Sequence, residues 1–196
     1  MNRRWLRTTA ACGALFCGLF GAAAILAPHP RFIWNASASV PVGLYAIDVG
    51  AKPARGDLVA IAPPAPFSDW LSERGYLPRG VPLLKRVAAT NGALVCRSGV
   101  FVTIDGAPAA RTRSADRMGR TLPLWLGCRR LERGELFVLG LSPDSLDGRY
   151  FGPLPASAVI GTAHPILTRD ASGAPLRWRR NGARHSTNLP DEEQTS

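Results

Sequence analysis

Residues 35–45 read Asn-Ala-Ser-Ala-Ser-Val-Pro-Val-Gly-Leu-Tyr and follow the one long apolar segment of the chain. Pro41 has a fixed φ and biases Val40 toward an extended conformation. We therefore predict that Ser39 lies on a stiff, extended piece of chain, where it can serve as a nucleophile. The alternative for this stretch is a Ser/Ala/Pro linker between a membrane segment and a domain.

The N-terminus has the pattern of a membrane anchor. Three arginines and no acidic residue occupy the first seven positions, and Thr9 to Ala27 then runs without a charge. A helix of that length is about what a ~30 Å hydrocarbon core requires. Pro28 follows directly and disfavours cleavage, so we predict an uncleaved transmembrane anchor over residues 1–27, with a cleaved signal peptide as the alternative. The positive-inside rule places the rest of the chain outside the cytoplasm.

The remainder is long enough for one globular domain, which we assign to residues 28–168, followed by a basic tail at 169–196 that we expect to be disordered. The 24 Lys+Arg and 14 Asp+Glu give a formal charge of +10. Such a charge permits binding of nucleic acid or anionic lipid. The arginines are scattered along the chain, however, and only Lys52 and Lys85 are lysines.

Lys85 interrupts an apolar run that is typical of a buried strand. Alternation places it on the same face as Leu83 and Val87. If that face is the inner one, desolvation lowers the pKa of the amine toward neutrality and makes Lys85 a general base. The alternative is a lysine that extends to solvent from an edge strand.

The four cysteines divide into two pairs. Cys12 and Cys17 lie in the apolar segment, whereas Cys96 and Cys128 lie in the exported domain. Cysteines in an oxidising compartment are expected to pair. A disulfide between Cys96 and Cys128 would close a loop of about 33 residues, worth about 3 to 4 kcal/mol in the chain-entropy model. Neither has a Cys or His at metal-ligand spacing, so we expect no metal and no cofactor.

Short apolar runs between turn residues predict a mainly β domain. Prolines at positions 63, 64 and 66 break the pattern, and we expect a short helix there, capped by Ser68 and ending near Glu73. The predicted strands cover 44–49, 58–61, the run around Lys85, 93–97, 99–104, 135–139 and 159–167.

Several motifs occur in the order of the characteristic boxes of type I signal peptidases, and the chain resembles that family over about residues 3–167. These are Ser39, Gly56-Asp57, Lys85-Arg86 with Asn91-Gly92, and Ser145-x-Asp147-x-Arg149-Tyr150-x-Gly152. Leader peptidases typically have two residues between the serine and the proline, whereas this chain has only Val40. The TraF branch, the peptidases of conjugative transfer, is matched by Ser39-x-Pro41-x-Gly43-x-Tyr45 and by Gly75-Tyr-Leu-Pro-x-Gly before Leu84-Lys85-Arg86.

The resemblance implies a Ser/Lys mechanism. Ser39 would attack the scissile carbonyl, and neutral Lys85 would accept its proton. The backbone N–H of Ser39 and the hydroxyl of Ser37 would stabilise the oxyanion. Ser145 would hydrogen-bond the lysine, and Asp147 with Arg149 would order the surrounding loop.

The resemblance also implies a fold and a setting. A transmembrane helix would precede an antiparallel β domain of barrel-like curvature, to which an extended peptide can add as a strand. The enzyme would sit in the bacterial inner membrane as a single-pass protein with a periplasmic domain. Its substrate would be a pilin precursor, released as a linear or a cyclised product, and other transfer components would be partners.

Two alternatives remain open at this point. One is a general leader peptidase. The other is a basic, non-enzymatic membrane component of a transfer or secretion complex, which accounts for the charge but leaves Lys85 and the Ser39 stretch without a role. A nucleic-acid partner is disfavoured because the domain is expected outside the cytoplasm.

Overall fold

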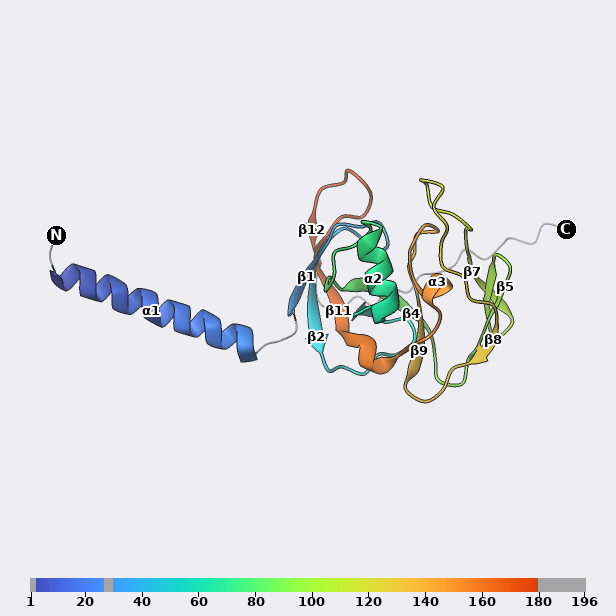
Figure 1. Cartoon of the computed structure of the whole chain (residues 1–196), viewed down its shortest axis with the longest axis horizontal. Coiled ribbons are helices and arrows are strands. Elements are labelled where there is room, and N and C mark those ends of the chain that lie inside the picture. The colour runs from blue at the N-terminus through green and yellow to red at the C-terminus, as the bar shows by residue number, and fades with distance from the viewer. Residues whose placement is uncertain (1–2, 27–29, 180–196) are drawn as a thin grey trace.

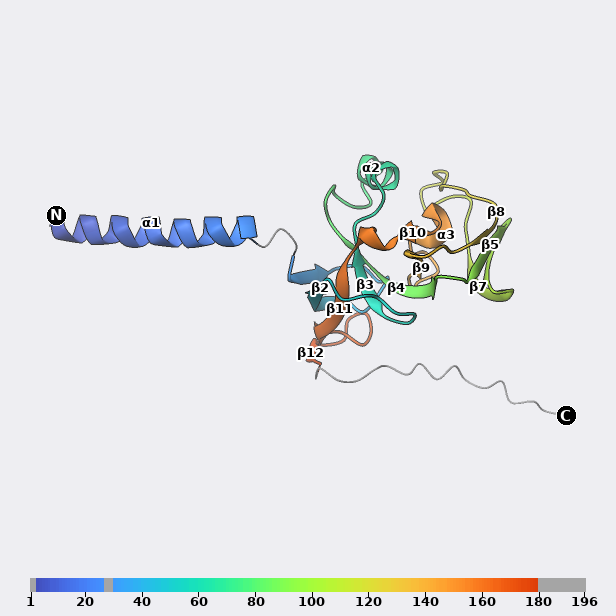
Figure 2. The same cartoon turned by 90° about the horizontal axis from the view of Figure 1, so that it is seen from below.

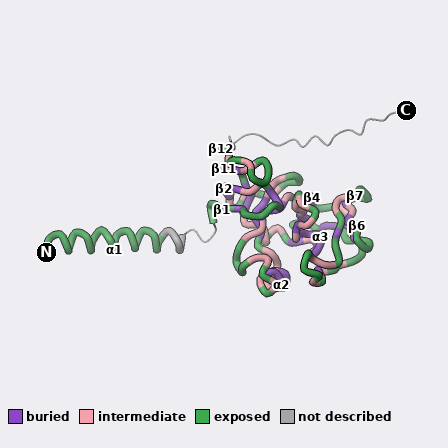
Figure 3. The backbone as a smooth tube through the Cα atoms, turned by 90° about the horizontal axis from the view of Figure 1, so that it is seen from above, coloured by how far each residue is buried: buried purple, intermediate pink, exposed green. Residues whose placement is uncertain are grey.

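The computed structural model describes residues 3–26 and 30–179. The chain begins with helix α1 (Arg3–Leu26), which Figure 1 shows apart from the β domain. Its side chains are exposed through residue 22, whereas purple, buried segments are concentrated in the β domain (Figure 3). None of the helices in the described residues has the length and apolar character needed to cross a membrane. The transmembrane segment therefore stays a prediction.

The β domain contains two sheets, and their strand pairs are antiparallel, as predicted. The larger has the order β1-β2-β11-β3-β4-β9-β10, with β12 paired to β11. Its strands are β1 (Phe32–Asn35), β2 (Gly43–Val49), β3 (Leu58–Ile61), β4 (Leu83–Thr90), β9 (Glu135–Leu139), β10 (Leu154–Pro155), β11 (Val159–Thr168) and β12 (Arg177–Trp178). The predicted mainly β fold is thus confirmed.

The smaller sheet has the order β7-β6-β5-β8. Figure 2 shows it beside α3 and on the side of the domain away from α1. Asp105 has a positive φ of 51° and begins the turn from β6 to β7 with Gly106, and Asp-Gly is a residue pair that is typical of such hairpin turns. The strands of this sheet are β5 (Leu94–Ser98), β6 (Phe101–Ile104), β7 (Ala107–Arg111) and β8 (Gly127–Arg130).

Strand β4 links the cores of both sheets. It lies between β3 and β9, and its register to β9 shifts between Val87 and Ala89. Val87 therefore packs in the core of the larger sheet, whereas Ala89 packs in the core formed with the smaller sheet. Because β4 is an interior strand, the edge-strand alternative for Lys85 is wrong.

The helix after β3 begins earlier than predicted. Helix α2 spans Ala65–Glu73, with Pro64 at its N-cap and no side-chain cap. The predicted Ser68 cap is wrong because a proline is favourable in the first turn of a helix, where its missing N–H has no intrahelical partner. Phe67 and Leu71 are buried and pack with Leu122 and Tyr150, so this excursion is held onto the domain.

The predicted disordered tail is structured over its first residues. Strand β12 pairs Leu167 with Trp178, and Arg179 Nε donates to Thr168 Oγ1 at 2.8 Å. The end of β11 extends past its pairing with β3, so its backbone N–H and C=O groups have no partner from β3 there. Strand β12 pairs with this free edge. The prediction is therefore wrong for residues 169–179, and residues 180–196 lie outside the described part of the chain.

Candidate active site

Ser39 lies in a tight turn between β1 and β2, not in an extended segment as predicted. Proline restricts only the residue immediately before it, so Pro41 constrains Val40 and leaves Ser39 free to turn. The Ser39 side chain is largely buried, with 9% of its surface exposed. Its carbonyl accepts a hydrogen bond from Leu141 N at 3.1 Å, which ties the turn to the segment that follows β9.

The side chain of Asn35 organises this turn. Its Nδ2 donates to the carbonyls of Ser37, Val40 and Pro41 at 2.8, 3.0 and 3.2 Å. The hydroxyl of Tyr45 donates to the Pro41 carbonyl at 2.6 Å from the other side. Sequence analysis missed Asn35 because the branch motif begins at the serine, although Asn is a residue that commonly bonds nearby backbone groups.

The two serines of the turn are in hydrogen-bond contact. Ser37 Oγ lies 2.9 Å from Ser39 Oγ and donates to Asn35 Oδ1 at 2.9 Å. The structure thus brings together both residues that the sequence predicts for oxyanion stabilisation and nucleophilic attack.

Lys85 is buried on an interior strand and is only 2% exposed. Burial is the main cause that lowers its pKa from 10.5 to about 8, and Arg149 lowers it further by a smaller effect. The Asp147 carboxylate acts in the opposite direction. Nζ donates to Ser145 Oγ at 2.9 Å. At pH 8 about half of the Lys85 side chains are therefore neutral and able to accept a proton.

Two links bring the Ser39 turn close to β4. Val40 and Leu84, the neighbours of Ser39 and Lys85, belong to one buried hydrophobic cluster. The segment after β9 binds the Ser39 carbonyl through Leu141 N and also supplies Ser145. Among residues 3–26 and 30–179 no hydrogen bond joins Ser39 directly to Lys85, since each bonds to its own serine partner.

Asp147 and Arg149 form a buried ion pair with Nε to Oδ1 at 2.8 Å. Asp147 Oδ2 also accepts from Gly140 N at 2.7 Å, and Oδ1 accepts from Arg149 N at 3.1 Å. The Arg149 guanidinium donates to the carbonyls of Pro143, Gly140 and Arg111. The pair thus closes residues 140–149 into a compact loop and holds Ser145 against Lys85.

Gly140 is required at the start of this loop. A Cβ at this position would overlap Ser145 Oγ, and it would approach Asp147 Oδ2 to 3.4 Å. Gly148 is similarly confined, because a Cβ there would lie 2.6 Å from the carbonyl oxygen of Val138. A side chain at Gly140 would therefore displace Ser145, the partner of Lys85, and a side chain at Gly148 would push the loop away from β9.

The smaller sheet supports the same loop through Arg97, which sequence analysis missed. Arg97 is 4% exposed, and its Nη1 donates to the Arg149 carbonyl at 2.6 Å while Nη2 donates to Thr112 Oγ1 at 3.2 Å. The adjacent Cys96 pairs with Cys128 across β5 and β8, and the predicted disulfide is present. It joins β8 covalently to the strand that carries Arg97.

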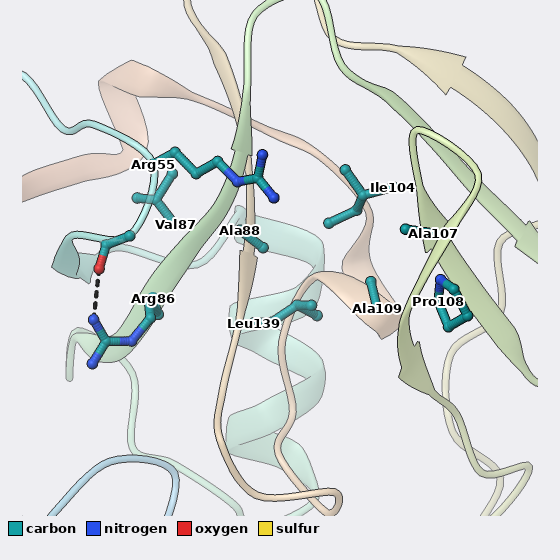
Figure 4. A pocket seen from close by; sticks show the side chains of 10 residues that line it. Arg55, Arg86, Val87, Ala88, Ile104, Ala107, Pro108, Ala109 and Leu139 are labelled. Carbon is teal, nitrogen blue, oxygen red and sulfur yellow. Dashed lines mark hydrogen bonds between the residues drawn. The ribbon is translucent and has the colours of Figure 1, made fainter. Parts of the chain in front are cut away.

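A cavity of about 350 Å³ lies between the two sheets, and neither Ser39 nor Lys85 lines it. Figure 4 shows Arg55 and Arg86 on one side of this cavity and Ile104 with Ala109 on the other. Arg86 donates to the Gly56 carbonyl at 2.6 Å and is held at the rim by that bond. The cavity is therefore distinct from the serine and lysine cluster.

Comparisons with known proteins show the family of the chain. The family model of signal peptidase, peptidase S26, matches residues 2–168. A conjugal transfer protein TraF of Agrobacterium fabrum is 36% identical over 148 residues, covering 69% of this chain and 82% of the relative. A plasmid transfer protein TraF of Escherichia coli is 35% identical over 146 residues, covering 68% of this chain and 81% of the relative.

Among solved structures, a signal peptidase I from Enterococcus faecalis V583 matches with a TM-score of 0.34 and 23% identity, covering 57% of this chain and 97% of that chain. The sequence matches to the TraF proteins cover most of both chains. The chain belongs to the signal peptidase S26 family, in its branch of TraF-type conjugal transfer proteins.

Proposed function

We propose that this protein is a serine endopeptidase of a conjugative transfer system, in which Ser39 is the nucleophile and Lys85 the general base. The observation that carries the proposal is Lys85 itself. A lysine that is 2% exposed on an interior strand, with a pKa of about 8, can be neutral at physiological pH. Ser145 holds its amine at 2.9 Å and fixes its direction.

In the proposed reaction, the Ser39 hydroxyl turns from Ser37 to the neutral Lys85 amine, which takes its proton as Oγ bonds to the scissile carbonyl carbon. The resulting oxyanion accepts hydrogen bonds from the Ser39 N–H and the Ser37 hydroxyl. Among the described residues the Ser39 N–H has no hydrogen-bond partner, so it is available to an incoming oxyanion. The Lys85 ammonium then protonates the leaving amine as the peptide C–N bond breaks, which leaves an acyl-enzyme on Ser39.

The substrate in this proposal is a pilin precursor, which is what the resemblance to the TraF branch implies. The relatives named as conjugal and plasmid transfer proteins support the setting in a transfer system. The acyl-enzyme can be resolved by water, which gives a linear product. It can also be resolved by the N-terminal amine of the pilin, which gives a cyclic product when that amine is held close to the ester. Both routes use the same residues of this chain.

A membrane location completes the proposal, with α1 in the inner membrane and the β domain in the periplasm. Exposed apolar side chains cover α1, including Trp5, Phe16 and Phe20. On the β domain, the cross-strand pairing aligns Trp34, Leu44, Leu167 and Trp178 in one row on one sheet face.

The two tryptophans in this row are 53% and 75% exposed. Tryptophan is enriched at membrane interfaces, so this face of the β domain is suited to contact with lipid headgroups. The Cys96–Cys128 disulfide supports an oxidising compartment such as the periplasm.

Co-expression with the pilin precursor of the same transfer system tests the proposal. We expect the intact mass of the pilin to fall with the wild-type chain and to remain that of the precursor with Ser39→Ala. A product one water lighter than the linear chain of the same residues would establish cyclisation. A precursor that is processed equally by Ser39→Ala would overturn the assignment.

The general leader peptidase is the alternative within the family, and cleavage of secretory precursors in place of pilin would favour it. The non-enzymatic basic component remains the alternative from another class. A lysine buried beside a buried serine contributes nothing to such a role, although burying its amine costs free energy.

A further inference from the structure

We infer that Asn35 is a positioning residue that fixes the Ser37 hydroxyl beside the nucleophile. The inference rests on the proposed function of Ser39. Asn35 is 8% exposed and lies at the end of β1, where it contacts the backbone on both sides of Ser39. It lies four residues before Ser39 in the sequence.

The orientation of the Asn35 amide follows from its surroundings. Three carbonyl oxygens, those of Ser37, Val40 and Pro41, lie 2.8 to 3.2 Å from Nδ2. Only the NH₂ end of the amide can face three acceptors, because an amide oxygen in that place would be repelled by all of them. The amide oxygen must therefore point the other way, toward Ser37.

The direction of the serine hydroxyls follows in turn. Asn35 Oδ1 accepts both the N–H of Ser37 at 3.2 Å and its Oγ–H at 2.9 Å. A hydroxyl has one proton to donate, so Ser37 Oγ can only accept in its 2.9 Å contact with Ser39 Oγ. In this resting state the Ser39 proton points to Ser37, while Lys85 is bound to Ser145.

Asn35 therefore does two things to the proposed site. It holds Ser37 Oγ 2.9 Å from Ser39 Oγ, the atom that attacks the scissile carbonyl, and so beside the place where the substrate's carbonyl oxygen becomes the oxyanion. It also provides the acceptor that the Ser37 hydroxyl leaves when it turns to the oxyanion. After that turn, Asn35 Oδ1 keeps the Ser37 N–H as a partner, so no buried acceptor is left unsatisfied. Asn35 acts through Ser37 and does not itself touch the substrate.

Acylation of the full chain in detergent micelles by p-nitrophenyl acetate tests this inference without knowledge of the natural substrate. The burst of p-nitrophenolate reports attack by Ser39. We expect Asn35→Ala to lower the burst rate constant by roughly 10²-fold, as for the loss of one oxyanion donor. The apparent pKa of the pH profile should stay at about 8, because Lys85 and its partner are untouched.

The decisive comparison uses a Ser37→Ala background. In that background the hydroxyl that Asn35 positions is missing. We therefore expect Asn35→Ala to lower the burst rate constant by a factor at least about ten-fold smaller than the factor in the wild-type chain. An equal factor in both backgrounds would overturn the inference and show that Asn35 only maintains the turn. If Asn35→Ala raised only KM and left the burst rate constant unchanged, the inference would be overturned as well.

Ser37→Ala alone guards against a folding defect, since it keeps Asn35 Nδ2 and the three carbonyls that this atom binds. We expect this variant to unfold in denaturant like wild type but to acylate about as slowly as Asn35→Ala, and a wild-type burst rate constant in Ser37→Ala would contradict the inference. Ser98→Ala, on the exposed end of β5, is the matched surface control. A burst that persists in Ser39→Ala would instead overturn the proposed function.

Discussion

The amine of Lys85 and the hydroxyl of Ser145 lie 2.9 Å apart, although 60 residues separate them in sequence. Both side chains are buried, at 2% and 5% exposure. The lysine comes from an interior strand and the serine from a loop that Asp147 and Arg149 hold closed. This contact sets the direction of the amine that the proposed reaction requires.

Ser145→Ala should lower the acylation rate by roughly 10- to 100-fold. A hydrogen bond to a charged or polarised amine is worth about 1.5 to 3 kcal/mol, and its loss leaves the Lys85 amine without a fixed orientation. The rate constant of the p-nitrophenyl acetate burst measures the effect. Ser157→Ala, at an exposed position, is the control, and an equal rate for both variants would contradict a positioning role for Ser145.

Lys85→Arg should abolish processing, because a guanidinium keeps the positive charge but cannot lose its proton in a protein. The chain provides its own matched control in Lys52, which is exposed and is the other lysine. Lys52→Arg should process precursor at the wild-type rate. The mass of the mature product reports both variants, and substantial cleavage by Lys85→Arg would rule out the Ser/Lys mechanism.

Asp147→Asn should destabilise the domain by about 3 to 5 kcal/mol, because it leaves the buried Arg149 guanidinium without its counter-charge. The exposed pair between Arg79 and Asp69 is the control, and Asp69→Asn should cost no more than about 1 kcal/mol. Denaturant unfolding measures both. If both variants lost the same small amount of unfolding free energy, the buried pair would not be what holds the loop.

The Cys96–Cys128 disulfide should contribute about 3 to 4 kcal/mol in the chain-entropy model. Cys96→Ser with Cys128→Ser should therefore unfold at lower denaturant concentration, whereas Cys12→Ser with Cys17→Ser should not. Thiol labelling of denatured, unreduced protein provides the direct check. Two labelled thiols per chain are expected, and four would show that the disulfide does not form in the cell.

The sequence predicts the parts of the site that are defined by local chemistry. The strand over 58–61 has the predicted bounds, and of the two alternatives that the sequence leaves open for Lys85, the structure has the buried strand. The motif order also brings Ser37 and Ser145 into the prediction, and the structure places each beside its expected neighbour.

The features that the sequence could not provide depend on tertiary contacts. Asn35 is an ordinary polar residue until the turn folds around its amide, and Arg97 resembles any other arginine until the smaller sheet meets the loop. The tail after residue 168 has a polar composition, yet the free edge of β11 pairs with β12. Propensity and composition contain no information about such partners.

The pH dependence of the acylation burst tests most directly whether neutral Lys85 activates Ser39. Burial lowers the pKa of Lys85 from 10.5 to about 8, and only the unprotonated amine can accept the serine proton. The burst rate constant should therefore rise with pH through a single inflection near 8, become constant above it, and disappear in Lys85→Arg. An inflection near 10.5, or a profile that Lys85→Arg leaves unchanged, would contradict the role of Lys85 as the base.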